Sequence, residues 1–143
     1  MTIFVDTNVL VYARDTIEPD KRARAKAWLE ALWRSGSGRL SFQVLQEYYV
    51  TVTKKLSVAM PVADARADIQ NLLAWRPVTI DGRIMAGAWQ VQDRFRLSFW
   101  DALIVASAKA GGADRLLTED LSDGQTFDGL LVVDPFRHEP ESH

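Results

Sequence analysis

The chain has 143 residues, of which 48% are hydrophobic and 25% charged, and this balance excludes a disordered or fibrous protein. Its 17 basic and 19 acidic residues give a net charge of −2, which argues against nucleic-acid binding by bulk positive charge. The absence of cysteine excludes disulfides and thiolate metal sites and suits a reducing cytoplasm. The apolar runs are too short to span a membrane, so we expect a single cytoplasmic domain over residues 1–143, with a polar tail from about residue 137.

The predicted elements alternate between strands and helices along the chain. Short apolar or β-branched segments predict strands at Thr2–Val5, Arg39–Phe42, Pro77–Ile80, Ala113–Thr118 and Leu130–Val133. Helical periodicity predicts helices at Asp20–Ser35, Gln43–Leu56, Val62–Trp75, Gly82–Phe95 and Phe99–Ala110. The first and last strands are apolar on both faces, which favours a parallel sheet covered on both sides. The expected fold class is therefore an α/β sandwich.

Acidic residues follow two of these strands, at the place where open α/β sheets bind their ligands. Asp6 comes directly after Thr2–Val5, and Thr118-Glu119-Asp120 ends the segment Ala113–Thr118. Each has a plain structural alternative. Asp6 could cap a helix, and Asp120 begins a stretch of turn composition.

Two further acids lie on predicted helices. Asp101 falls in the first turn of Phe99–Ala110, three residues after Ser98, which is compatible either with helix capping or with a metal ligand in a desolvated place. Glu47 lies off the apolar stripe of its helix, which is typical of a solvated surface glutamate. Periodicity alone gives Glu47 no function.

Taken together, four segments resemble the PIN-domain family and, within it, VapC-type toxin ribonucleases: Phe4–Leu10, Gln46–Glu47, Phe99–Ile104 and Leu117–Asp120. The resemblance implies a PIN-like three-layer α/β/α sandwich with a central parallel sheet of about five strands. It also implies that the catalytic and metal-binding carboxylates are Asp6, Glu47, Asp101 and Asp120, with Asn8 and Thr118 as supporting residues. Glu119 and Asp123 lie in the same last loop, so which acid assists Asp120 stays open.

This ligand set contains only oxygen donors, which suits Mg²⁺, with Mn²⁺ as a possible substitute, and disfavours zinc. The expected function is that of a metal-dependent endoribonuclease in which water attacks the RNA phosphodiester and leaves 5′-phosphate and 3′-hydroxyl ends. As implied by the resemblance, it would be the toxin of a toxin–antitoxin pair, inhibiting growth or translation when free, with a VapB-type antitoxin and a second copy of itself as partners.

RNA would need basic or aromatic residues close to these acids. The clusters Lys21–Lys26, Lys54–Lys55 and Arg94–Arg96 are candidates, although each is also typical of a solvated helix face. Trp100 could stack on a base, but core packing is the expectation for an aromatic residue in such an apolar helix.

Three other functions remain open. A phosphoacceptor signalling domain would use Asp6 for Mg²⁺ and Asp81 as the acceptor, but it expects an acidic pair after the first strand. A haloacid-dehalogenase-type phosphatase would need a second aspartate where Asn8 stands. A non-catalytic PIN-like binding module is the third.

Overall fold

The computed structural model describes residues 1–140, which form six α-helices and five strands. The strands are β1 (Ile3–Val5), β2 (Gly38–Arg39), β3 (Arg115–Leu117), β4 (Thr126–Phe127) and β5 (Leu130–Val133). The helices are α1 (Thr7–Tyr12), α2 (Pro19–Ser35), α3 (Phe42–Val50), α4 (Val62–Leu72), α5 (Gly82–Phe95) and α6 (Phe99–Ala110). A π-helical turn at Thr51–Lys55 extends α3, and a 3₁₀ turn at Leu73–Trp75 extends α4.

The strands form one sheet in the order β2-β1-β3-β5-β4. β1 is parallel to both β2 and β3, and β3 is parallel to β5, whereas β4 is antiparallel to β5. β1 is completely buried and has a neighbour on each side, as its apolar sequence predicts. In register, Val5 faces Leu117, so β1 and β3 end side by side.

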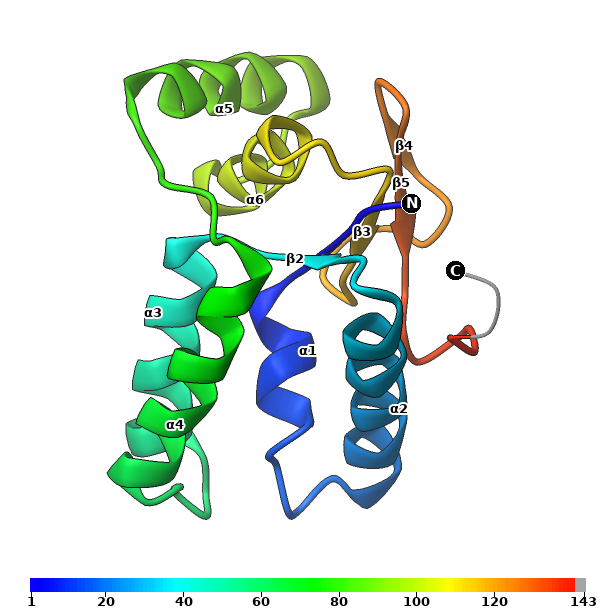
Figure 1. Cartoon of the computed structure of the whole chain (residues 1–143). Helices are drawn as coiled ribbons and strands as arrows, with labels where there is room; N and C mark the ends of the chain where they lie inside the picture. Colours follow the sequence, from blue (N-terminus) through cyan, green and yellow to red (C-terminus); the bar gives the residue numbers. More distant parts are fainter. Residues whose placement is uncertain (141–143) are drawn as a thin grey trace.

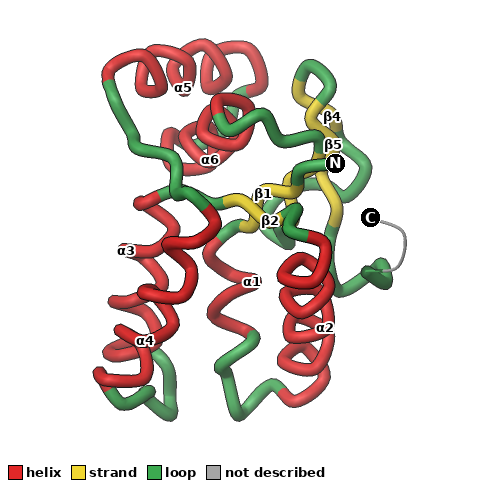
Figure 2. Tube along the Cα trace, in the orientation of Figure 1, coloured by secondary structure: helices red, strands yellow, loops and turns green. Residues whose placement is uncertain are grey.

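Helices cover both faces of this sheet, which gives three layers (Figure 1). α5 and α6 lie on one face, and α1 to α4 lie on the other. Figure 2 shows the short strands as a thin layer between the two groups of helices. α6 is the more deeply buried helix of the pair α5 and α6, since every residue from Ala102 to Ala108 is buried. The expected α/β/α sandwich with a five-stranded sheet is confirmed.

Local polar groups determine where the helices begin. The side chains of Ser41, Asp81 and Ser98 accept hydrogen bonds from first-turn N–H groups of α3, α5 and α6 respectively. Gly38 is needed in β2 because a Cβ at this position would lie 2.8 Å from the ring of Trp75. The indole ring thereby covers the outer edge of the sheet.

Two strands predicted from sequence were wrong, and two elements were not predicted. Pro77–Ile80 forms no strand but a single parallel bridge between Val78 and Ser41, because it is confined between Arg76, at φ 51°, and the Asp81 cap of α5. Instead of a strand over Arg39–Phe42, β2 spans Gly38–Arg39, and Ser41 forms only the bridge to Val78 because it is the N-cap of α3. The antiparallel strand β4 was not predicted, and neither was α1.

The polar tail expected from about residue 137 packs back onto α2 over the part that the structure describes. The indole N–H of Trp28 donates to the carbonyl oxygens of Pro135 and His138, at 3.1 and 3.0 Å, and Arg24 forms an ion pair with Glu139. Residues 141–143 of that tail lie outside the described residues. Within residues 1–140, none of the helices combines the length and apolarity that a membrane crossing requires.

Candidate functional site

The ends of β1 and β3 place two predicted carboxylates at one edge of the sheet. Asp6 directly follows β1, and its backbone N–H donates to the carbonyl oxygen of Leu117 in β3 over 3.0 Å. Asp120 lies three residues beyond Leu117. Because neighbouring parallel strands end at the same edge, two acids that are 114 positions apart in sequence become neighbours.

Asp6 is buried and accepts hydrogen bonds through both carboxylate oxygens. Oδ1 accepts from the backbone N–H of Thr7 at 2.7 Å, and Oδ2 accepts from the hydroxyl of Thr118 at 2.8 Å. The first of these bonds makes Asp6 the N-cap of α1. The capping alternative is therefore confirmed, and it leaves Oδ2 in the site.

Asn8 links the two acids. Its amide Nδ2 lies 3.1 Å from Asp120 Oδ2, 3.1 Å from Thr118 Oγ1 and 3.4 Å from Asp6 Oδ2. The backbone N–H of Asp120 donates to the same hydroxyl oxygen of Thr118 over 3.1 Å. Asn8 Oδ1 is buried without a hydrogen-bond partner among the described residues. Of the two supporting residues predicted from sequence, Asn8 contacts both carboxylates, and Thr118 contacts the carboxylate of Asp6 and the backbone of Asp120.

Glu47 reaches the site from α3. Its Oε2 accepts from the hydroxyl of Thr7, and its Oε1 accepts from the side-chain amide of Gln43, both over 2.9 Å. Glu47 is exposed, as periodicity predicted, yet both of its oxygens are held by protein donors. Sequence reasoning missed Thr7 and Gln43. The spacing of Gln43 and Glu47, one helical turn apart, was the signal available for the second of them.

Asp101 stands in the first turn of α6, where the hydroxyl oxygen of Ser98 accepts from its backbone N–H at 3.2 Å. Its carboxylate approaches Asp120 closely enough to act on that group electrostatically. The adjacent Trp100 is 62% exposed, so the expectation of core packing was wrong. The ring of Phe99 packs edge-to-face on it, with 5.3 Å between ring centroids.

Mutual repulsion and burial disfavour negative charge in this group. Burial raises the pKa of Asp6 from 3.8 to about 7; hydrogen bonds from Thr118 and Thr7 oppose this shift, and the charges of Asp120 and Glu47 add to it. Burial also raises the pKa of Asp120, against the hydrogen bond from Asn8, and the charges of Asp101, Glu119 and Glu47 raise it further. A cation would relieve this repulsion.

The side chains fit a hydrated divalent cation better than a closed metal cage. Within residues 1–140, no three Asp, Glu or His side chains converge into a ready-made metal cluster. Mg²⁺ does not require one, since it usually binds one or two carboxylates and keeps several waters. The buried, unpartnered Oδ1 of Asn8 could accept a hydrogen bond from such a water. The oxygen donors of this edge therefore fit Mg²⁺ or Mn²⁺.

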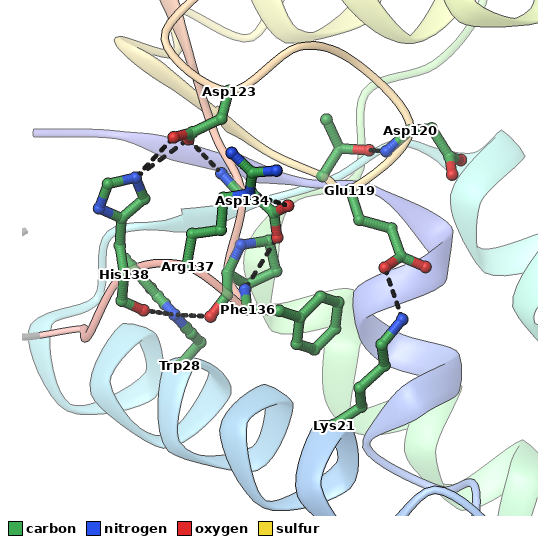
Figure 3. A network of polar contacts seen from close by, with 11 residues as sticks. Lys21, Trp28, Glu119, Asp120, Asp123, Asp134, Phe136, Arg137 and His138 are labelled. Carbon is green, nitrogen blue, oxygen red and sulfur yellow. Dashed lines mark hydrogen bonds and ion pairs between the residues drawn. The ribbon is translucent and has the colours of Figure 1, made fainter.

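The other two acids of the loop after β3 are bound elsewhere. Glu119 accepts from the ammonium group of Lys21 at 2.9 Å, and Asp123 contacts His138 at 2.9 Å (Figure 3). Asp123 also accepts from the backbone N–H of Asp134 at 2.9 Å. Of the three loop acids, Asp120 is thus the one that contacts the Asp6 group.

A cavity of about 700 Å³ lies on the helical face formed by α1 to α4. It is lined by apolar side chains such as Leu29, Trp33 and Leu72, with Arg14 and Asp68 among its polar groups. None of the four predicted catalytic carboxylates lines it, so this cavity is separate from the carboxylate site.

Residues 3–122 match the family model described as the PIN domain. Three solved structures share the fold. A toxin–antitoxin complex from Klebsiella pneumoniae aligns with a TM-score of 0.68 at 22% identity, over 97% of this chain and 99% of that one. The sarcin–ricin-loop-cleaving toxin VapC20 of Mycobacterium tuberculosis aligns with a TM-score of 0.61 at 22% identity, over 80% and 87%.

The third structure is VapBC2 of Rickettsia felis bound to a DNA fragment from its promoter. It aligns with a TM-score of 0.64 at 18% identity, over 92% of this chain and 97% of that one. No curated protein sequence matches this chain significantly.

Proposed function

Since the chain belongs to the PIN-domain family, we propose that it is an endoribonuclease that depends on Mg²⁺ or Mn²⁺ and hydrolyses RNA phosphodiesters. The observation that supports this best is the buried carboxylate of Asp6, whose pKa is raised to about 7 and which lies among further carboxylates from other elements. Burying like charges together costs free energy unless a cation joins them, so this arrangement favours a function over a structural role.

In this proposal Asp6, Glu47, Asp101 and Asp120 hold the cation and are the catalytic residues. When bound, a divalent cation supplies a water of lowered pKa and stabilises negative charge on the leaving oxygen. The protein orients the ligands: Thr118 donates to Asp6 and accepts from the backbone of Asp120. Such outer contacts commonly control metal affinity.

The chemistry of the site favours water over the RNA 2′-hydroxyl as nucleophile. Attack by the 2′-hydroxyl needs a general base and a general acid, for which ribonucleases commonly use histidine. The chain has histidine only at positions 138 and 143, and His138 is bound to Asp123 on the other side of the loop. Hydrolysis would therefore leave 5′-phosphate and 3′-hydroxyl ends.

The proposed biological role is that of a cytoplasmic toxin, inhibited by a small VapB-type antitoxin and active as a homodimer. Three similar structures support this role because of the proteins that they contain: a toxin–antitoxin complex, the sarcin–ricin-loop-cleaving toxin VapC20, and VapBC2. The three alignments cover between 80% and 97% of this chain, so the same architecture is shared over most of its length.

The decisive experiment measures cleavage of a structured RNA by the purified chain with Mg²⁺, Mn²⁺ or EDTA, followed by analysis of the product ends. We expect cleavage with either metal, none with EDTA, and 5′-phosphate ends. Asp6→Asn should abolish cleavage, while Asp15→Asn, which removes a half-exposed acid of the α1–α2 loop, should not. Metal-independent cleavage that leaves 2′,3′-cyclic phosphates would contradict the proposal.

The phosphoacceptor alternative loses its support in the structure. Asp81 does not follow a strand of the sheet, and its Oδ1 accepts from the backbone N–H of Ile84 at 3.0 Å as the N-cap of α5. The non-catalytic binding module remains the competing function, and a wild-type chain that binds metal and RNA without cutting RNA would establish it.

A further inference from the structure

Lys21, in the first turns of α2, is bound to the loop that contains the proposed metal ligand Asp120. Its ammonium group lies 2.9 Å from Glu119 Oε2, and the two residues are 98 positions apart in sequence. The Lys21 side chain is 37% exposed and that of Glu119 is 23% exposed. This pair is therefore better shielded from solvent than a typical surface ion pair.

Aromatic side chains hold the ammonium group in place. Lys21 Nζ lies 4.6 Å from the ring centroid of Tyr12 and 5.0 Å from that of Phe136, and it donates to the Tyr12 hydroxyl at 3.4 Å. The two rings meet edge-to-face, with 5.2 Å between centroids. A lysine confined in this way has already lost most of the freedom that makes exposed lysine pairs weak.

This contact determines the direction of one loop acid. Figure 3 shows the side chain of Glu119 reaching toward Lys21, while the neighbouring Asp120 points away from that pair. Asp120 is held on its own side by Asn8 and by the hydroxyl of Thr118. Glu119 is thus bound by Lys21 of α2, and the adjacent Asp120 is bound by Asn8 of the carboxylate site.

We propose that Lys21 is a positioning residue for the cation site: by binding Glu119, it fixes the turn Thr118–Asp120 so that Asp120 alone is presented to Asp6. This inference rests on the proposed metal-dependent function. The contacts of Lys21 within residues 1–140 are with Glu119, Tyr12 and Phe136 and not with the four proposed ligands, so it acts through Glu119.

The test is Mn²⁺ binding by the purified full chain without RNA, measured by electron paramagnetic resonance of free Mn²⁺. Lys21→Met removes a positive charge near the site, so simple electrostatics predicts tighter binding. Positioning predicts the opposite sign: we expect Lys21→Met and Glu119→Gln each to weaken Mn²⁺ binding about tenfold. The double variant should bind no more weakly than either single variant, since both break the same contact.

Two controls separate positioning from charge and from folding. Lys21→Arg keeps a cation that can contact the rings and Glu119, so Mn²⁺ binding should stay within about twofold of wild type. Lys26→Met removes an exposed lysine from the same helix and should leave Mn²⁺ affinity unchanged. Thermal unfolding of each variant reports whether the fold is intact, and Glu119→Gln tests the same contact from the loop if Lys21→Met fails to fold.

RNA kinetics give a second readout. Lys21→Met should lower kcat and leave KM unchanged, whereas a lysine that simply contacts RNA phosphates would raise KM. Unchanged or tighter Mn²⁺ binding in Lys21→Met, or additive losses in the double variant, would overturn the role of Lys21. Failure of the proposed function looks different: the wild type would then cleave no RNA in any metal, whatever the variants do to Mn²⁺ affinity.

Discussion

Asp120 and Asp123 belong to one short loop, yet the loop places them in opposite electrostatic surroundings. Asp120 lies among other carboxylates, and burial together with those charges raises its pKa. Asp123 accepts from the backbone N–H of Asp134 and contacts His138, and these contacts lower its pKa. The surroundings thus disfavour ionisation of Asp120 and favour ionisation of Asp123.

The comparison separates acids that stabilise the fold from acids that are available for chemistry. The ionised form of Asp123 is stabilised by partners within the chain, so it needs no external ligand. The ionised forms of Asp6 and Asp120 face other negative groups, so a cation from outside would stabilise them. The candidate site is distinguished by carboxyl groups whose pKa values are raised, because their surroundings disfavour the ionised form.

The largest expected effect is the difference in kcat between Asp120→Asn and Asp123→Asn, the same substitution at two positions of one loop. Asp120→Asn should lower kcat for metal-dependent RNA cleavage about a thousandfold, because it removes a proposed metal ligand. Asp123→Asn should keep kcat within about threefold of wild type. Single-turnover cleavage at saturating Mg²⁺ measures both, and equal losses would remove the distinction between the two acids.

The stability of the metal-free protein should depend on the ionisation of Asp6. Its pKa is raised from 3.8 to about 7 in the folded state, so folding favours the protonated form. This contribution is fully present below about pH 4 and is lost as the pH rises through about 7, which lowers the free energy of unfolding by about 4 kcal/mol.

Urea unfolding in EDTA at a series of pH values measures this loss, and Asp6→Asn should flatten the profile. Saturating Mn²⁺ should restore stability at high pH, since it binds the folded state. A metal-free wild type that is as stable at pH 8 as at pH 5 would contradict the assignment.

Thr118→Val tests the hydroxyl that joins Asp6 to Asp120. The variant removes the donor to Asp6 and the acceptor of the Asp120 N–H, so we expect about a tenfold loss of kcat and a further rise in the pKa of Asp6. The pH–rate profile with Mn²⁺ measures both changes. Thr126→Val replaces an exposed threonine of β4 and is the matched control; a similar loss there would point to a general effect on the sheet.

The smallest effect is expected at His138. Its contact with Asp123 joins partly exposed groups, with side chains 46% and 22% exposed, so His138→Gln should cost less than about 1 kcal/mol. The stability that comes from the lowered pKa of Asp123 is present above its ordinary value of 3.8 and disappears as the pH falls below it. Thermal unfolding of this variant at pH 7 and pH 3 measures the difference.

The central part of the fold follows from local sequence patterns. Ile3–Val5 and Leu130–Val133 are apolar on both faces and become strands of a covered sheet, and five of the six α-helices begin within one residue of their predicted start. The errors occur in segments whose secondary structure depends on tertiary contacts rather than on local sequence. β4 is a two-residue strand defined only by its pairing with β5, and Pro77–Ile80 stays extended with one bridge because the neighbouring backbone prevents more.

The same limit applies to the carboxylate site. Asp6 and Asp120 could be anticipated because both follow strands of a parallel sheet. Glu47 could not be distinguished from a surface glutamate by periodicity, since its hydrogen bond to Thr7 exists only when α1 and α3 pack together. The contact between Lys21 and Glu119 was invisible for the same reason: no local pattern connects residues so far apart.

During synthesis, β1 leaves the ribosome long before its partner β3 exists, because Ile3 pairs with Arg115. Until then Asp6 has no hydrogen bond from the hydroxyl of Thr118 and no neighbour in Asp120, so the carboxylate site is incomplete. Such non-local strand pairing also slows folding. The carboxylate site can therefore assemble only after the segment that contains β3 and Asp120 has been synthesised.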